Sequence, residues 1–225
     1  MTAEDYIFSR IRGVIFDMDG TIIDSMELHL RVWKEIIEKH GRKMSLKDVG
    51  ENVSGINNEI IERIFPAKYS DEEKENIANE KEIEFRSQFD PDKNVIKGFL
   101  LFIEKLKQRQ IPMAIGSAAS LENIRFVLKA LDIESYFVGI IHEDIVEAGK
   151  PNPDVFIQAA KLIEVPVGSC LVFEDSTTGA EASQKAGCHT IVVLSNKSKV
   201  DFKEIGSIKA YIRDYQSLSS VEILS

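Results

Sequence analysis

The chain has 225 residues, of which 44% are hydrophobic and 29% are charged, and its net charge is −9. This composition is typical of a soluble globular protein with one large domain, or with a core domain and a smaller second one. The acidic balance argues against non-specific binding to nucleic acid or to an anionic membrane surface, because like charges repel.

No targeting or membrane-spanning segment is evident. The N-terminal segment lacks a cationic start followed by an apolar block, and no run of about 18 apolar residues occurs. We therefore expect a cytoplasmic protein, and a monomer by default. The two cysteines, Cys170 and Cys188, form no CxxC pair and lie in or near apolar stretches. Buried, reduced thiols are the expectation for both, rather than zinc ligands.

The first predicted element is a short buried strand over residues 14–16. An apolar run of β-branched and aromatic residues, followed by Asp and Gly, is typical of a strand that ends at a turn. Asp17 and Asp19 follow it two residues apart, so on an extended backbone both carboxylates face the same small volume. At a separation of about 4 Å, two such charges repel by about 1 kcal/mol in water and by roughly 4 kcal/mol at an effective dielectric constant near 20. The pair therefore needs a cation or a shared proton nearby.

A block of predicted helices follows. Periodic apolar residues predict a helix over residues 25–40, with Ser25 as its N-cap and Gly41 as its stop. Further helical segments are expected over residues 46–49, 58–65 and 71–88. No convincing strand is present between residues 25 and 90.

This all-helical block interrupts a chain in which strands and helices otherwise alternate. We interpret residues 25–92 as a second domain inserted into a core made of residues 1–24 and 93–225. The segment Asp90-Pro91-Asp92 is the expected return linker.

Strands and helices alternate over the rest of the chain. Strands are predicted over residues 111–115, 138–141, 170–173, 190–194 and 210–212. Helices are predicted over residues 99–107, 121–131, 153–162 and 178–186, with Asn152 as a cap of the third. The alternation predicts an α/β fold with a doubly wound parallel sheet and helices on both faces. Such sheets bind ligands at the carboxyl ends of their strands.

Polar side chains follow three of the predicted strands, and a lysine precedes a predicted helix. They are Asp17 with Asp19, Ser117, Glu174 with Asp175, and Lys150. If all of them meet, four carboxylates and one ammonium leave a charge of −3. A divalent cation reduces this charge to −1, and a proton on Asp19 brings it to zero. Oxygen ligands without His or Cys suit Mg²⁺. Lys150-Pro151 is a candidate cis peptide, since about 5–6% of X–Pro bonds in folded proteins are cis.

Four motifs in this order resemble those of the haloacid dehalogenase-like (HAD) superfamily. They are Asp17-Met18-Asp19-Gly20-Thr21, Ser117, Lys150-Pro151 and Phe173-Glu174-Asp175-Ser176. The resemblance covers essentially the whole chain, and the helical block is similar to the C1-type cap of that family. Each motif alone is weak, but all four in order with the alternating pattern are specific. The resemblance implies a Rossmann-like core with an inserted cap, and an enzyme rather than a non-catalytic binding module on the same fold.

The resemblance also implies a role for each motif residue. Asp17 would be the nucleophile that forms an aspartyl phosphate, and Asp19 would protonate the leaving oxygen and then activate water. Gly20, Thr21, Ser117, Ala118 and Lys150 would bind the phosphate. Mg²⁺ would be held by Asp17, the backbone carbonyl of Asp19 and Asp175, with Glu174 close by. An acid at position 19 favours phosphate-ester transfer, because departure of a halide needs no proton.

The predicted cap resembles that of β-phosphoglucomutase-like members. His29 stands where a histidine assists the acid/base aspartate, although an ordinary solvated side chain is the alternative. Residues 53–58 look like the specificity loop, with Gly55 and Asn58 as candidate substrate-binding residues. The mutases carry an arginine near the place of Asn58 and a lysine shortly after the second-motif serine, where this chain has Ala118 and Ala119. A mutase must hold two phosphates. We therefore favour a phosphatase for a small sugar or polyol phosphate, with a β-phosphoglucomutase-type mutase as the alternative.

Overall fold

The computed structural model describes residues 10–53, 57–142, 145–194 and 198–219. The chain divides into two compact units, which we call the core unit (1–24 and 91–225) and the helical unit (25–90). Each unit is described by itself. The return boundary lies between residues 90 and 91, whereas the sequence analysis expects it between residues 92 and 93.

A parallel β-sheet forms the centre of the core unit. Within the described residues it has six strands in the order β3-β2-β1-β4-β5-β6, and every neighbouring pair is parallel. The strands are β1 (Gly13–Phe16), β2 (Met113–Ser117), β3 (Gly139–His142), β4 (Cys170–Glu174), β5 (His189–Val193) and β6 (Ile208–Ile212). The chain adds β2 and β3 on one side of β1 and β4 to β6 on the other. This reversal of strand order creates a switch point at the carboxyl ends of the central strands.

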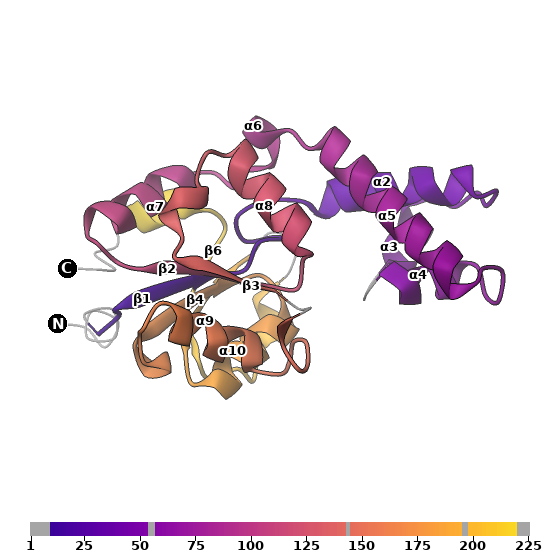
Figure 1. Cartoon of the computed structure of the whole chain (residues 1–225). Helices are drawn as coiled ribbons and strands as arrows, with labels where there is room; N and C mark the ends of the chain where they lie inside the picture. Colours follow the sequence, from indigo (N-terminus) through magenta and orange to yellow (C-terminus); the bar gives the residue numbers. More distant parts are fainter. Residues whose placement is uncertain (1–9, 54–56, 143–144, 195–197, 220–225) are drawn as a thin grey trace. The chain divides into compact units, whose positions relative to one another are not determined.

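Helices cover both faces of this sheet (Figure 1). On one face, α9 (Asp154–Leu162) packs on β1, β2 and β3, and α10 (Thr177–Ala186) packs on β4 and β5. The other face carries α7 (Phe99–Gln108) and α8 (Leu121–Ala130). The predicted doubly wound α/β fold is confirmed. The central strands β1, β2 and β4 are buried along their whole length, as expected of strands covered on both faces.

The helical unit consists of α2 (Met26–Lys39), α3 (Leu46–Asn52), α4 (Asn57–Ile64) and α5 (Asp71–Gln88). Helix α2 packs against α3 and α5, and α4 packs against α3 and α5. The buried side chains of α2 recur at helical spacing and form one apolar face: Leu28, Val32, Trp33, Ile36 and Ile37. Capping boxes at Ser45 and Ser70 begin α3 and α5. The described residues of this unit contain no strand, in agreement with the sequence analysis.

Three local expectations are wrong in detail. Ser25 precedes α2, but its backbone is helical and its side chain makes no capping bond, because capping requires an extended residue. The expected return linker instead starts a short helix, α6 (Pro91–Asn94), since proline is well suited to the first turn of a helix. Pro153, not Asn152, precedes α9, although Asn152 Oδ1 still accepts a hydrogen bond from the Asp154 N–H at 3.0 Å.

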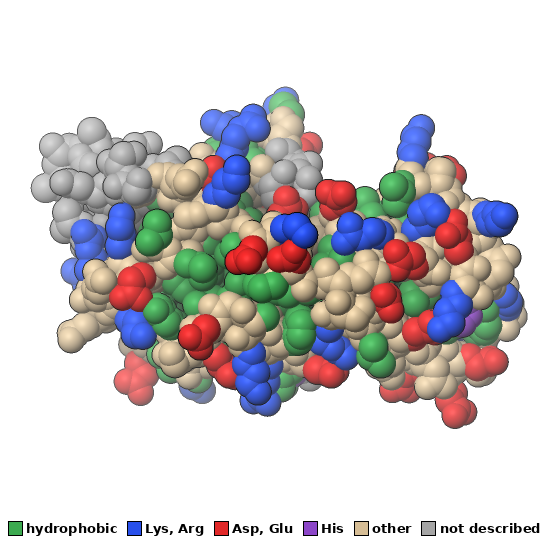
Figure 2. All heavy atoms as spheres, turned by 90° about the horizontal axis from the view of Figure 1, so that it is seen from above, with side chains coloured by type: hydrophobic (Ala, Val, Ile, Leu, Met, Phe, Trp, Pro, Cys, Tyr) green, Lys and Arg blue, Asp and Glu red, His purple; other side chains and the backbone are tan. Residues whose placement is uncertain are grey.

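The two cysteines are free and buried, as predicted. Burial raises the pKa of each thiol to about 12, so neither is reactive near neutral pH. On the face shown in Figure 2, Lys and Arg side chains lie among Asp and Glu side chains rather than in a separate patch. None of the helices in the described part of the chain combines the length and apolar character that a membrane crossing needs.

Candidate active site

The loop after β1 carries the first two predicted site residues. Met18 is buried between Asp17 and Asp19, so the two aspartates alternate with a core side chain. The Met18 carbonyl accepts hydrogen bonds from the N–H groups of Thr21, Ile22 and Ile23 at 2.8–3.2 Å. Gly20 turns the chain with φ +73°, a conformation that favours glycine. The loop is therefore compact and holds Asp19 directly beyond the end of β1.

Lys150 links the ends of β1 and β4. Its Nζ donates to Asp17 Oδ1 at 2.7 Å and to Glu174 Oε1 at 2.8 Å. All three side chains are at most 9% exposed. The register of β1 and β4, in which Phe16 lies beside Phe173, brings the two carboxylates together. The Lys150-Pro151 peptide is cis, as considered in the sequence analysis.

Burial and charge oppose each other at these groups. Burial raises the pKa of Asp17 to about 7, and the charges of Glu174 and Asp19 add to this effect while Lys150 counteracts it. Burial acts to lower the pKa of Lys150, but Asp17 and Glu174 outweigh it and raise this pKa above its usual range. The charged form of Lys150 is thus favoured, and a further cation would favour the ionised form of Asp17.

Glu174 has partners on both carboxylate oxygens. Lys150 binds Oε1, and Oε2 accepts from the backbone N–H of Ser176 at 2.6 Å and from its hydroxyl at 2.9 Å. Ser176 also caps α10 by accepting a hydrogen bond from Gly179 N–H. A Cβ atom at Gly179 would lie 1.7 Å from Glu174 Oε1, so only glycine leaves room for the carboxylate there.

Asp175 lies against the loop after β1. A Cβ atom at Gly20 would be 2.3 Å from Asp175 Oδ2, so the carboxylate contacts the turn between Asp19 and Thr21. The Thr21 hydroxyl is buried and has no hydrogen-bond partner among the described residues. A buried hydroxyl without a protein partner fits a bound ligand, since such groups are otherwise nearly always paired.

These donors fit Mg²⁺ and a phosphate group. The oxygens of Asp17, Asp19 and Asp175 are hard ligands of the kind that Mg²⁺ prefers. Lys150 binds Oδ1 of Asp17 and does not occupy Oδ2. In the part of the chain that is described, no group of three or more His, Cys, Asp or Glu side chains is already gathered around a metal position. Lys150 lies between Asp17 and Glu174.

Ser117 ends β2, the strand beside β1. It is buried, and its hydroxyl accepts a hydrogen bond from Ala119 N–H at 3.2 Å. Ala118 follows it and is exposed. The register places Phe16 beside Ile115, so Asp17 and Ser117 both leave the carboxyl end of the sheet. The core residues of the predicted site thus come from β1, β2, β4 and the Lys150 loop, all at one end of the sheet.

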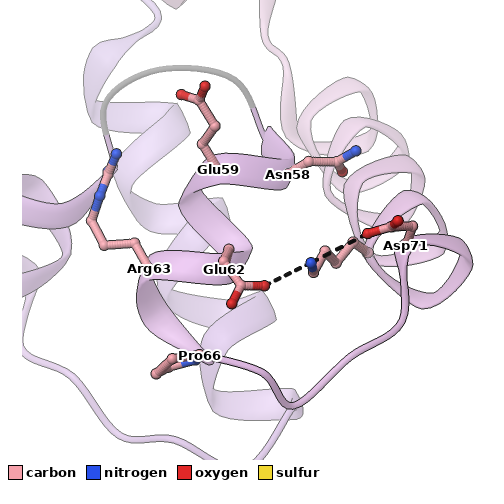
Figure 3. Close-up of a pocket in the computed structure, with 7 residues that line it drawn as sticks. Asn58, Glu59, Glu62, Arg63, Pro66 and Asp71 are labelled. Carbon is pink, nitrogen blue, oxygen red and sulfur yellow. Dashed lines mark hydrogen bonds and ion pairs between the residues drawn. The ribbon is translucent and has the colours of Figure 1, made fainter.

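The other predicted residues belong to the helical unit. His29 lies on α2, and its ring stacks on Phe85 with centroids 4.4 Å apart. Asn58 is exposed in the first turn of α4, and Gly55 lies outside the described residues. Asn58 lines a concavity of about 560 Å³ between α4 and α5 with Glu62, Arg63 and Lys74 (Figure 3). Lys74 is paired there with Glu62 at 2.6 Å and with Asp71 at 3.4 Å.

Three residues of the core site are absent from the predicted set. Ser176 and Gly179 hold Glu174, and the Phe156 ring lies 4.9 Å from Lys150 Nζ. Ser176 ends the fourth motif and stands at a strand-to-helix junction, where serine is a preferred N-cap, so the sequence held a signal for it. Phe156 offers no comparable signal, since an apolar residue on a helix is usually core.

We predict that Gly179→Ala destabilises the protein. Alanine normally stabilises a helix relative to glycine by about 0.5–1 kcal/mol. Here the added methyl would overlap the carboxylate of Glu174. We therefore expect the free energy of unfolding to fall by about 1–3 kcal/mol. Gly50→Ala in α3 is the matched control, because the nearest atom is 3.7 Å away and the ordinary gain should appear. Urea unfolding measures both. A stabilising effect of both substitutions would contradict this account of Glu174.

Comparison with known proteins places this site in a family. The profile of the haloacid dehalogenase-like hydrolases matches residues 14–193. The β-phosphoglucomutase of Bacillus subtilis is 31% identical over 192 residues, which cover 81% of this chain and 83% of that protein. The fructose-1-phosphate phosphatase YqaB of Escherichia coli is 28% identical over 187 residues, or 83% of this chain and 98% of that protein.

A solved structure agrees with the sequence matches. The HAD hydrolase, family IA, variant 3, from Entamoeba histolytica superposes with a TM-score of 0.84 at 27% identity. The alignment covers 95% of this chain and 98% of that one. The matched range, residues 14–193, contains Asp17, Ser117, Lys150 and Glu174. The chain belongs to the haloacid dehalogenase-like hydrolase family.

Proposed function

We propose that this chain is a Mg²⁺-dependent phosphatase that hydrolyses a small sugar or polyol phosphate monoester through an aspartyl-phosphate intermediate. The observation that carries the proposal is the buried bridge of Lys150 between Asp17 and Glu174, directly beside the loop that bears Asp19. A phosphatase and a phosphomutase among the relatives support a phosphoester as substrate.

In the first step, an Asp17 carboxylate oxygen attacks the phosphorus, and the bond from phosphorus to the substrate oxygen breaks. Asp19 gives its proton to that leaving oxygen, so the product departs as a neutral alcohol. In the second step, Asp19 takes a proton from water while the water oxygen attacks the same phosphorus. The bond to Asp17 then breaks, which releases inorganic phosphate and restores the Asp17 carboxylate.

The remaining core residues hold the reacting groups. Lys150 keeps Asp17 in place and supplies a positive charge to the phosphoryl oxygens, and Glu174 fixes Lys150. The hydroxyls of Thr21 and Ser117 would donate to the same oxygens, with the backbone at Gly20 and Ala118 beside them. Asp17, Asp175 and the Asp19 carbonyl would hold Mg²⁺, which when bound neutralises the phosphate and favours ionised Asp17. Because both oxygens of Glu174 have partners, we assign it to Lys150 rather than to the metal.

The helical unit is the proposed cap that selects the substrate. His29, Asn58 and Gly55 remain candidate substrate-binding residues in it. The cations around Asn58 have protein partners: Lys74 pairs with Glu62, and the Arg63 guanidinium donates to the Asn52 carbonyl. These pairings support a substrate with one phosphate over a bisphosphate.

A sugar-phosphate mutase is the second candidate function, because the Bacillus subtilis β-phosphoglucomutase is 31% identical. The two functions differ in the group that accepts the phosphoryl group from the aspartyl phosphate. A phosphatase transfers it to water, and a mutase returns it to a sugar. Supplying β-glucose 1-phosphate with a trace of the 1,6-bisphosphate separates them. Isomerisation to glucose 6-phosphate faster than phosphate release would favour the mutase over the phosphatase.

We predict that Asp17→Asn abolishes hydrolysis. The wild-type protein with Mg²⁺ should release phosphate from p-nitrophenyl phosphate and from some members of a panel of sugar phosphates. An amide cannot act as the nucleophile, so the rate should fall by at least about 10³-fold. Asp132→Asn replaces an exposed aspartate outside the site and should leave the rate unchanged. An inert wild-type protein across the whole panel would favour a non-catalytic binding module.

We also predict that a chelator stops the reaction and that added Mg²⁺ restores it. Asp175→Asn should raise the Mg²⁺ concentration for half-maximal rate by about tenfold or more, because one anionic ligand is lost. Glu174→Gln should instead lower the maximal rate with a smaller change in Mg²⁺ dependence, since we assign Glu174 to Lys150. Steady-state rates over a Mg²⁺ titration measure both effects. Full activity in excess chelator would rule out the metal requirement.

A further inference from the structure

Tyr215 links the C-terminal segment of the core unit to the loop after β1. Its hydroxyl donates to the Thr21 backbone carbonyl at 3.0 Å, across 194 residues of sequence. Both residues are at most 2% exposed. Water therefore cannot replace this bond, and its loss would leave a buried carbonyl without its donor.

The backbone around Tyr215 is fixed. Tyr215 N–H donates to the Lys97 carbonyl at 2.9 Å. Gly98 has φ +79°, and a Cβ atom there would lie 2.7 Å from the backbone nitrogen of Gln216. This close approach seats the short helix η5 (Tyr215–Ser219) against the start of α7.

The ring of Tyr215 is fixed as well. Its centroid lies 5.1–5.4 Å from those of Phe99, Phe102 and Phe173, and 6.5 Å from that of Phe16. Phe16 and Phe173 stack on each other at 5.0 Å and directly precede Asp17 and Glu174. The ring therefore packs beside the strand residues that precede the two carboxylates bridged by Lys150. Packing on several sides gives the ring a defined place, and from there its hydroxyl donates to the Thr21 carbonyl.

The bond acts on the loop that positions Asp19. Thr21 N–H is bonded to the Met18 carbonyl, and Gly20 N–H donates to the Ile23 carbonyl at 2.7 Å. Tyr215 binds the Thr21 carbonyl from outside the loop, so both polar backbone groups of Thr21 have a partner. Burial, with a smaller contribution from the charge of Asp17, holds the pKa of Tyr215 well above its ordinary value, so its proton stays in place.

We infer that Tyr215 is a positioning residue, whose hydroxyl fixes the loop after β1 and so aims Asp19 at the leaving oxygen. This inference rests on the proposed phosphatase function, in which Asp19 supplies the proton. It makes Tyr215, at the start of the short helix η5, part of the support of the loop that bears Asp19.

Tyr215→Phe tests the inference, because it keeps the ring and removes only the hydroxyl. Tyr136→Phe is the matched control: it also removes one hydroxyl hydrogen bond, from Tyr136 to Glu104 at 2.6 Å, away from the loop. Both variants are assayed below their unfolding temperatures with p-nitrophenyl phosphate and with an alkyl phosphate that the wild type hydrolyses. An alkoxide is a far poorer leaving group than p-nitrophenolate, so only the alkyl phosphate depends strongly on the proton from Asp19.

The expected result for Tyr215→Phe is a fall in kcat of about tenfold for the alkyl phosphate, with a change of less than about threefold for p-nitrophenyl phosphate and little change in KM. Equal losses for both substrates, or losses no larger than those of Tyr136→Phe, would overturn the inference. A residue with a merely structural role would not change the ratio of the two substrates.

Amide hydrogen exchange separates this inference from the proposed function. In Tyr215→Phe, the N–H groups of Thr21, Ile22 and Ile23 should exchange about tenfold faster than in the wild type, with no such change in Tyr136→Phe. Unchanged exchange would show that the Tyr215 hydroxyl does not stabilise the loop, and it would overturn the inference. If the wild type hydrolyses no phosphate ester, the proposed function fails, while the exchange result still decides whether Tyr215 holds the loop.

Discussion

The buried bridge of Lys150 between Asp17 and Glu174 is the interaction on which the site depends. Two carboxylates at the ends of neighbouring strands would repel strongly away from water, and the ammonium at 2.7 and 2.8 Å removes that cost. A bridge of this kind contributes little net stability, because three charged groups lose their hydration. Its value lies in geometry, since it fixes the two carboxylates before substrate arrives. The pKa of Asp17 is still raised to about 7 by its burial, so the proposed metal ion would help to keep that group ionised.

Two supports on opposite sides hold this bridge in place. On the β4 side, Ser176 donates hydrogen bonds to Glu174 at the start of α10, and Gly179 leaves room for its carboxylate because it has no side chain. On the β1 side, the aromatic cluster around Phe16 and the hydroxyl of Tyr215 hold the strand end and the following loop. The proposed nucleophile and the proposed acid thus lie on backbone that these contacts hold in place, and positioning supplies most of the rate of phosphoryl transfer.

Local patterns predicted the fold and the core of the site well. The apolar run before Asp17 and the alternation of strands and helices were sufficient for a parallel sheet, because both signals depend on near neighbours in sequence. The meeting of Asp17 and Glu174 followed from the rule that the ends of parallel strands share one edge, whereas the place of Lys150, which lies in a loop, came from the resemblance to the family. The contact of Tyr215 with Thr21 could not be predicted, since it joins residues 194 positions apart and neither belongs to a periodic pattern. The partners of Glu174 and the short helix at Pro91 were missed for a related reason: each depends on the exact backbone path at a junction.

The identity of the nucleophile is the central claim, and a covalent intermediate tests it most directly. The wild-type protein is mixed with substrate and Mg²⁺, quenched in acid within the first turnover, and mapped by peptide mass spectrometry. We predict a phosphoryl group on Asp17, and none on Asp19 or Asp175. A phosphoryl group on another residue, or turnover with direct transfer to water shown by inversion of configuration at a chiral phosphate, would contradict the account.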